Sequence, residues 1–425
     1  MQYTSKRIHL PLFLVVLLQA TSHVQSECEF SQYSYYHSGI FLQQFGEGYT
    51  MVNFQGNPIR IPDQGSMEAV CSSGFRFPGH PQIFGKIEGE PGRDYEEYTN
   101  VTITCQNGDM IYHLPGGLKQ DVEENSLICK DNKARFYKAN VANCGETGFL
   151  YGFMVKEVPV ILAEVCYNIA EDKTLFVHFI GGKRSVVLEN QTQHNPSLMS
   201  EHLHNFGKYV FPNHAEMQKS LDKIFVLPGY TYIAEYKLEY LAPMANYSSL
   251  IGNLADNFEY PNVIPMWTTL RNYNWRIFQD LLRKESMKES FEIYAGTSGK
   301  VQYPYDLRCN STTDFSVWED TLEVNIPLHI WYYLTARGKP DVSTVVIAVN
   351  SPIVELGPST VICTDVCDEI SWLKPMSRSR KILSLGYIYC CKPQVVANLL
   401  KGFPLNEGTD SAAKSKNGAA PKSKM

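Results

Sequence analysis

A cationic stretch between residues 271 and 288 contains the residue types that most clearly suit a chemical function in this sequence. It holds five basic and two acidic residues, a local surplus of three positive charges. If a helix follows Asn274, then Arg276, Gln279 and Arg283 share one helix face. Guanidinium and ammonium groups in that arrangement suit the oxygens of a phosphate backbone, whereas the alternative is a set of solvated helix charges without a ligand. The residues predicted to contact phosphate in this stretch are Arg271, Arg276, Arg283 and Lys284.

Two segments around this stretch keep a distinctive order of residues. A Leu-Ala-Pro motif lies at 241–243, and a second segment, 262–275, begins with Asn262 and ends with Trp275. A Tyr-x-Gly-Thr turn pattern follows at 294–299, before the last four cysteines. Together these segments resemble the DNA/RNA non-specific endonuclease family, the ββα-metal nucleases, in its secreted arthropod branch. Within that branch, the closest resemblance is to the salivary nucleic-acid-binding proteins of tsetse flies.

The resemblance implies a hydrolytic centre whose key residues have been replaced. Tyr240 stands where the family has the histidine that deprotonates water, and a phenol, with a reference pKa near 10, is a poor base at neutral pH. Arg271 stands at the asparagine that binds Mg²⁺, but a guanidinium has no lone pair for a metal. Gln279 replaces a carboxylate that supports the hydrated ion. We therefore predict no intact catalytic residue, no metal ligand and no cofactor, with Mg²⁺ expected only if residual nuclease activity remains.

The same resemblance places two further groups at the nucleic acid. Asn262, which is retained in register, and Tyr240, whose position in the family points into the cleft, are predicted to join the basic residues in contacting it. Tyr240 is the best candidate for stacking on an exposed base, whereas Trp275 opens the helix on its apolar side and is predicted to lie in the core. The aromatic residues around the site that could stack on bases are Tyr236, Tyr240, Tyr247, Tyr273 and Trp275.

Histidines elsewhere in the chain offer two alternatives. His202 and His204 form a His-x-His pair that could chelate a metal from a strand, although surface histidines are the ordinary explanation for such a pair. A shifted alignment would instead make His202, His204 or His214 the catalytic base, but none of them is followed by a Leu-Ala-Pro motif.

The elements that position these residues are predicted to be of the α+β class. Residues 27–148 contain short β-like runs, such as 101–105, broken by Gly, Pro and Asn, which indicates a small disulfide-stapled β domain. Residues 149–404 mix strand-like segments, among them 174–180, with a helix-like segment from 274 to about 288. By the resemblance, this second domain is a ββα-metal nuclease-like α+β domain.

The two ends of the chain are predicted to stay outside the fold. Basic Lys6 and Arg7 precede an apolar run at 10–18 and a small-residue site, the order of a secretory signal peptide over residues 1–26. The apolar run is too short to anchor the chain in a bilayer, and no membrane partner is predicted. Residues 405–425 are rich in Ala, Ser, Gly and Lys, which predicts a disordered cationic tail that is solvated rather than bound to phosphate.

Cysteine usage indicates an oxidising compartment. Eleven cysteines are dispersed along the chain without a CxxC pair, so disulfides are favoured over a metal site. The odd number leaves one cysteine free or in an intermolecular bond. Four Asn-x-Ser/Thr sequons fit the same route, and the protein is predicted to be secreted and extracellular. The sequons lie at Asn100, Asn190, Asn246 and Asn310.

Net charge argues against part of this hypothesis. The formal charge is −6, and it becomes −8 without Lys6 and Arg7, which is not the basic balance of a typical phosphate-binding protein. Any nucleic-acid site must therefore be a local patch. The sequence predicts a secreted protein that binds DNA and RNA independently of sequence and hydrolyses them poorly or not at all. The alternatives are a weakly active Mg²⁺-dependent endonuclease and a secreted binding or structural protein without a nucleic-acid role, and the oligomeric state stays open.

Overall fold

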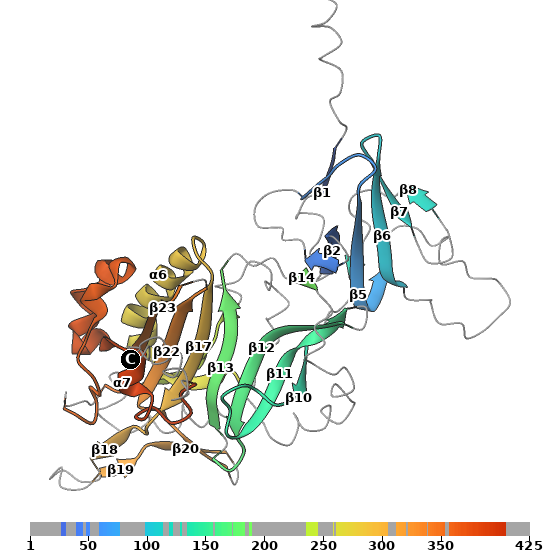
Figure 1. Ribbon diagram of the computed structural model, residues 1–425. Helices are drawn as coiled ribbons and strands as arrows, with labels where there is room; N and C mark the ends of the chain where they lie inside the picture. Colours follow the sequence, from blue (N-terminus) through green and yellow to red (C-terminus); the bar gives the residue numbers. More distant parts are fainter. Residues whose placement is uncertain are drawn as a thin grey trace, which may run out of the picture. The chain divides into compact units, whose positions relative to one another are not determined.

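The structure, a computed structural model, divides the chain into two compact units, Met1–Asn132 and Lys133–Met425 (Figure 1). The predicted signal peptide, the predicted tail at 405–425 and the histidines at 202–214 lie outside the residues that the structure describes. The described residues are 27–30, 40–45, 48–51, 59–76, 98–113, 119–121, 128–129, 134–155, 158–171, 173–182, 187–188, 235–244, 258, 261–304, 312–319, 322–337, 339–352 and 357–404.

The first unit contains an antiparallel sheet tied by disulfides. Its strands follow the order β3-β2-β5-β6-β7-β8, with β9 against β5 and a separate β1–β4 pair. Cys28–Cys105 and Cys71–Cys129 are the two disulfides, and all four cysteines lie in the buried core of this unit. The predicted strand at 101–105 is confirmed within β6, where buried and partly buried residues alternate. The strands are β1 (Cys28–Phe30), β2 (Ile40–Phe45), β3 (Gly48–Met51), β4 (Ile59–Ile61), β5 (Ser66–Arg76), β6 (Tyr98–Gln106), β7 (Asp109–His113), β8 (Lys119–Asp121) and β9 (Ile128–Cys129).

The second unit begins earlier in the chain than the sequence indicates. A boundary at residue 148 would cut β11 (Thr147–Val155), which pairs along its length with β12 (Val158–Asn168). β10 (Arg135–Lys138) pairs with β11, so both strands belong to the large sheet of this unit, and the division falls at Asn132. Hydrophobic alternation marks a strand but does not indicate which sheet the strand joins.

An eight-stranded antiparallel sheet forms the body of the second unit, in the order β10-β11-β12-β13-β17-β22-β23-β24. Figure 1 shows its central strands side by side. The predicted strand at 174–180 is confirmed as β13. Most residues of β22 are buried, including neighbours that point to opposite faces, which indicates that both faces are covered there. The remaining strands of the sheet are β13 (Lys173–Gly181), β17 (Phe291–Ser298), β22 (His329–Ala336), β23 (Lys339–Val349) and β24 (Ile388–Cys391).

The Tyr-x-Gly-Thr residues, 294–297, lie in strand β17, not in the turn expected from the resemblance. A side chain at Gly296 would collide with the indole of Trp331 and the carbonyl of Leu175, so a glycine is needed there for close packing. The turn begins only at Gly299, whose φ of +67° favours glycine.

A continuous helical segment packs on one face of the large sheet. It begins at Thr268, before the predicted start at Asn274, because the chain passes directly from a strand into the helix. Trp275 and Phe278 contact Tyr332 of β22, with ring centroids 5.1 and 5.5 Å apart. The prediction that Trp275 lies in the core is therefore confirmed. The segment consists of α5 (Thr268–Leu270), the π-helical turn η4 (Arg271–Trp275) and α6 (Arg276–Ser286).

Shorter elements surround the sheet. Three two-stranded antiparallel pairs are formed by β15 with β16, β18 with β19, and β20 with β21. The Cys144–Cys166 disulfide links the chain just before β11 to β12. Among the described residues, no helix combines the length and apolar character that crossing a membrane requires. These elements are β15 (Tyr236–Tyr240), β16 (Val263–Trp267), β18 (Gln302–Pro304), β19 (Thr312–Asp314), β20 (Ser316–Glu319), β21 (Leu322–Asn325), η5 (Cys367–Glu369), η6 (Ser371–Met376), η7 (Ser379–Lys381), η8 (Leu383–Leu385) and α7 (Pro393–Val396). The short strand β14 (Val187–Leu188) also falls within the residue range of the second unit.

Candidate nucleic-acid interface

Two strands and a helix position the Leu-Ala-Pro motif. β15 and β16 pair in antiparallel register up to Tyr240, which lies opposite Val263. The N–H of Leu241 then donates to the carbonyl of Asn262 at 2.7 Å, which extends the pairing into the motif. β16 continues without a loop into α5 and η4. The motif and the start of the helix are therefore held by one strand pair.

Asn262 is a structural group at this motif. It is 1% exposed. Its Oδ1 accepts the N–H of Ala242 at 2.7 Å, and its Nδ2 donates to the carbonyls of Ala242 at 2.9 Å and Phe258 at 3.3 Å. An amide whose donors and acceptor are used inside the protein presents nothing to a ligand. The prediction that Asn262 contacts nucleic acid is therefore wrong, and this residue instead positions the Leu-Ala-Pro motif.

Replacing Asn262 by alanine is expected to lower the free energy of unfolding by about 1–3 kcal/mol, because the N–H of Ala242 would be buried without an acceptor. Denaturant unfolding followed by circular dichroism measures this change. Asn272→Ala, at an exposed position on the neighbouring helix, is the control and should change stability by less than about 0.5 kcal/mol. Equal stability of the Asn262→Ala variant and the wild type would contradict the structural role.

A second buried asparagine anchors the strand pair on the sheet. Oδ1 of Asn350 accepts the N–H of Trp267 at 2.6 Å, and its Nδ2 donates to the carbonyls of Pro265 and Pro327, each at 2.9 Å. The hydroxyl of Tyr236 donates to the backbone carbonyl of Asn350 at 2.9 Å. Burial raises the pKa of Tyr236 far above its ordinary value, so this phenol remains a donor. Asn350 was not among the predicted site residues, and its signal in the sequence is a polar residue directly after an apolar strand.

The central contact of the site is an ion pair between Arg271 and Glu239. Nε of Arg271, the first residue of η4, donates to Oε2 of Glu239 in β15. Oε1 of the same carboxylate accepts the N–H of Tyr240 at 3.2 Å. The structure thus brings Tyr240 and Arg271 to one carboxylate. Gln279 lies about two helical turns further along the same helix, at a partly exposed position.

The residues at this centre do not fit a Mg²⁺ ion. Mg²⁺ requires oxygen ligands in near-octahedral geometry, whereas Arg271 offers only N–H donors and a permanent positive charge. The carboxylate beside it, Glu239, is already paired with that guanidinium. The centre is therefore built around an internal ion pair, and we assign no step that needs a bound metal to it.

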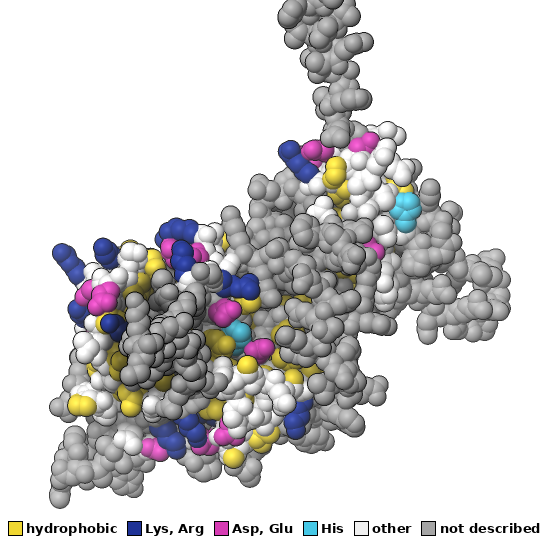
Figure 2. All heavy atoms as spheres, in the orientation of Figure 1, with side chains coloured by type: hydrophobic (Ala, Val, Ile, Leu, Met, Phe, Trp, Pro, Cys, Tyr) yellow, Lys and Arg dark blue, Asp and Glu magenta, His cyan; other side chains and the backbone are white. Residues whose placement is uncertain are grey.

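The helix surface beyond the ion pair carries charges of both signs. Arg276 and Lys284 are exposed, and within the described part of the chain neither takes part in an ion pair. Arg283 and Lys288 each pair with a carboxylate one helical turn away, at 3.2 and 2.7 Å. Figure 2 shows the same mixture, with Lys and Arg side chains next to Asp and Glu side chains over the coloured surface. Because Glu239 neutralises a further cation, the positive surplus is smaller than the sequence count suggests.

The aromatic residues predicted to stack on bases differ in their exposure. Tyr236 and Trp275 are buried, which excludes contact between either ring and a base. Tyr240 is partly exposed, and Tyr247 lies outside the described residues. Tyr273 in η4 is 52% exposed. Tyr273 therefore offers a more open aromatic surface than Tyr240, the residue that sequence analysis favoured.

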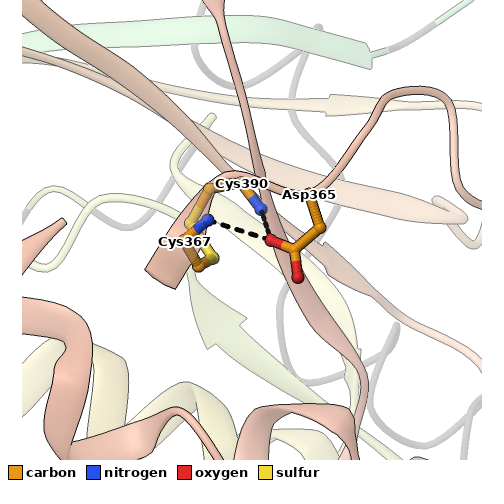
Figure 3. A group of neighbouring side chains, drawn as sticks. All are labelled: Asp365, Cys367 and Cys390. Atoms are coloured by element: carbon orange, nitrogen blue, oxygen red, sulfur yellow. Dashed lines mark hydrogen bonds between the residues drawn. A yellow bond between two sulfur atoms is a disulfide. The ribbon is translucent and has the colours of Figure 1, made fainter. Parts of the chain in front are cut away.

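A group of three potential metal ligands near the end of the chain is structural. Asp365, Cys367 and Cys390 lie within 4.8 Å of one another (Figure 3), and they are the only such group found among the described residues. The two sulfurs are bonded to each other, so neither is available to a metal. Oδ1 of Asp365 accepts the N–H groups of Cys367 at 3.0 Å and Cys390 at 3.1 Å, while Oδ2 pairs with Arg380. This carboxylate therefore links two backbone segments and a buried cation.

Comparison with known proteins gives a weak structural likeness. No family model matched the chain, and no curated protein matched it. A chain in the crystal structure of the EndoG/EndoGI complex, which concerns the mechanism of EndoG inhibition, is 13% identical to this chain. The match covers 57% of this chain and 84% of that chain, with a TM-score of 0.30. Because this score is too low to support an argument, the function is inferred from the residues of the site.

Proposed function

We propose that this protein is a secreted, sequence-independent nucleic-acid-binding protein whose site derives from a hydrolytic centre and cleaves DNA and RNA poorly or not at all. The observation that carries the proposal is the Arg271–Glu239 ion pair at the start of the helix. It occupies the position where the resemblance implies a metal ligand. The five disulfides fit an extracellular protein, and the one sequon within the described residues, at Asn100, is exposed.

Binding is supported by the cations that remain available on the helix. Arg276 and Lys284 are exposed and unpaired among the described residues, so a phosphate oxygen does not have to displace a carboxylate from them. Arg283 is paired with Asp280, but both side chains are about half exposed, and such surface pairs are weak and readily exchanged. Arg271 is held more firmly by Glu239. The helix therefore offers a small number of phosphate contacts, which predicts modest affinity and a shallow salt dependence, with a slope of log K against log salt of about 3 in magnitude.

The proposal is tested by a mobility-shift titration of duplex DNA and RNA across a salt series. Binding is expected at low salt and should weaken as salt rises. The Arg276→Ala/Lys284→Ala variant should bind more weakly, with a slope of log K against log salt that is shallower by about 2, since each phosphate contact contributes about 0.9. The matched control is Lys300→Ala/Lys401→Ala, which removes two cations that are paired with carboxylates elsewhere. Absence of binding at low salt would instead favour a secreted protein without a nucleic-acid role.

Glu239→Gln is expected to raise the affinity for nucleic acid about fivefold and to steepen the salt slope by about 1, because it frees the guanidinium of Arg271 for one more phosphate contact. In the wild type, Arg271→Ala should have little effect on affinity, because the guanidinium of Arg271 is already paired with Glu239. In the Glu239→Gln background, Arg271→Ala should remove the gain, and the double-mutant cycle measures this coupling. A gain that survives Arg271→Ala would show that Glu239 acts through another group.

A further inference from the structure

We propose that the site selects unpaired nucleic-acid strands, with the ring of Tyr273 as the surface on which an exposed base stacks. This inference rests on the proposed function and specifies the class of nucleic acid that the site prefers. The occupant of the apolar surface beside the basic residues of the helix is a single-stranded segment of DNA or RNA.

The apolar surface consists of Tyr273 and Ile277. Tyr273 is 52% exposed and Ile277 is 37% exposed. They are four residues apart, the spacing that places side chains next to each other on a helix. Within the described part of the chain, no other ring contacts Tyr273. Contiguous exposed apolar side chains mark interaction sites more often than single ones do.

An available cation beside this surface matches a phosphate backbone. Arg276 is exposed, precedes Ile277 and lies three residues after Tyr273. Tyr273 lies in the π-helical turn η4, and Arg271 at the start of that turn is paired with Glu239 and is not counted as a phosphate contact. Such turns are rare and are often found at functional sites. A cation next to an open aromatic ring is the combination that binds the backbone and the base of the same nucleotide.

The backbone beneath Tyr273 is fixed from the other side of the helix. The neighbouring Asn274 is fully buried, and its Nδ2 donates to the carbonyls of Ser379 at 2.7 Å and Gly386 at 2.6 Å. Gly386 has a φ of +89° and packs so closely on Leu270 that a side chain would not fit. A rigid support reduces the loss of freedom when a base binds, so an exposed ring in this position is suited to stacking.

The segment that accepts these hydrogen bonds also exposes apolar side chains of its own. Ile382 and Leu383 lie between Ser379 and Gly386 in the chain and are 45% and 46% exposed. Their segment is therefore held against the helix at both of its ends. An apolar surface of this kind offers nothing to a duplex, whose bases are already stacked on one another and whose outer surface is phosphate. It suits bases that are free to turn outward from a single strand.

The test compares three labelled probes of equal length by fluorescence anisotropy at low salt. They are an oligothymidylate, a DNA duplex and an abasic oligomer that has the phosphates but no bases. The wild type is expected to bind the oligothymidylate most tightly. Tyr273→Ala should weaken that binding about 5- to 100-fold and leave the other two affinities unchanged, because only the first probe can stack. Tyr273→Phe, which keeps the ring, should bind all three probes as the wild type does.

Met287→Ala is the control, because Met287 is also an exposed apolar residue at the helix but lies beyond its far end. It should leave all three affinities unchanged. Equal binding of the three probes, or an equal loss for all of them in Tyr273→Ala, would overturn this inference while leaving the proposed function in place. A dimer of the wild type that Tyr273→Ala dissociates, seen by sedimentation, would also overturn it. Failure of every probe to bind would instead refute the proposed function.

Discussion

Incubated with Mg²⁺ and plasmid DNA or RNA, the purified protein is expected to release products at least about 10²–10⁴-fold more slowly than an intact member of the DNA/RNA non-specific endonuclease family. Under the proposed function Tyr240 stands in place of the general base, and absence of that base alone would account for a reduction of this size, because a phenol has a reference pKa near 10. The ion pair of Arg271 with Glu239 adds to it, since a guanidinium repels a metal ion and offers no ligand atom. Product formation resolved on gels over time measures the rate.

Because both causes act together, neither single substitution is expected to restore cleavage. Tyr240→His restores a base but leaves the ion pair in place, so we expect no gain in Mg²⁺-dependent cleavage. Arg271→Asn removes the guanidinium but leaves no base, so we expect no gain there either. Cleavage by the wild type at ordinary turnover rates of about 1–10³ per second, abolished by EDTA, would establish the alternative of an active endonuclease.

Arg380→Ala is expected to lower the free energy of unfolding by about 3–5 kcal/mol, the range observed when one partner of a buried ion pair is removed. The side chain of Arg380 is 1% exposed and donates to Asp365 and to Asp368, the latter at 2.7 Å. Asp365 in turn holds the N–H groups of Cys367 and Cys390. Removal of the guanidinium therefore leaves a largely buried carboxylate without a counter-charge. Denaturant unfolding of the full chain measures the difference.

Lys381→Ala is the matched control for Arg380→Ala. Lys381 pairs with the same Asp368 at 3.3 Å, but both side chains are more than half exposed, so its loss should change stability by less than about 1 kcal/mol. Equal effects of the two variants would contradict a special role for the buried guanidinium.

The ion pair between Arg380 and Asp368 predicts the direction of a pH effect on stability. The hydrogen bond from Arg380 lowers the pKa of Asp368 below its ordinary value, and the charges of Arg380 and Lys381 add to this. A carboxyl whose pKa is lowered on folding stabilises the protein above its unfolded pKa. That contribution is lost as the pH falls through the folded pKa, so acid should destabilise the wild type more than Arg380→Ala.

Local sequence patterns predicted the features that depend on neighbouring residues. The apolar periodicity that places Trp275 in the core also predicted the body of α6, and a strand-like run of mostly apolar residues predicted β13. The helix starts earlier than Asn274, because no capping residue or loop separates it from β16. Patterns of this kind record which face of an element is apolar, and that information was sufficient for the helix and for the strand.

Contacts between distant residues could not be read from the sequence. Glu239 and Arg271 are 32 residues apart, and their pairing depends on the register of β15 with β16. A retained asparagine gives no sign of whether it faces a ligand or the backbone, so Asn262 was predicted to contact nucleic acid although it is buried. The same limit applies to Tyr240 and Tyr273, because exposure depends on what packs against each ring.

The cysteines have one property that the sequence predicted, disulfide formation, and one that it could not predict, the pairing. Disulfides were expected from composition, and ten of the eleven cysteines form five bonds, whereas Cys309 lies outside the described residues. Which cysteines pair with which was not predictable, because pairing depends on distances in the folded chain.

Two of these bonds, Cys363–Cys391 and Cys367–Cys390, are nested one inside the other. They enclose the turns η5 to η8, including Ser379 and Gly386, whose carbonyls receive the side chain of Asn274. A protease that nicks the chain once inside this loop would leave both fragments covalently attached. The support beneath the helix would then persist after cleavage, and only a reductant would release it.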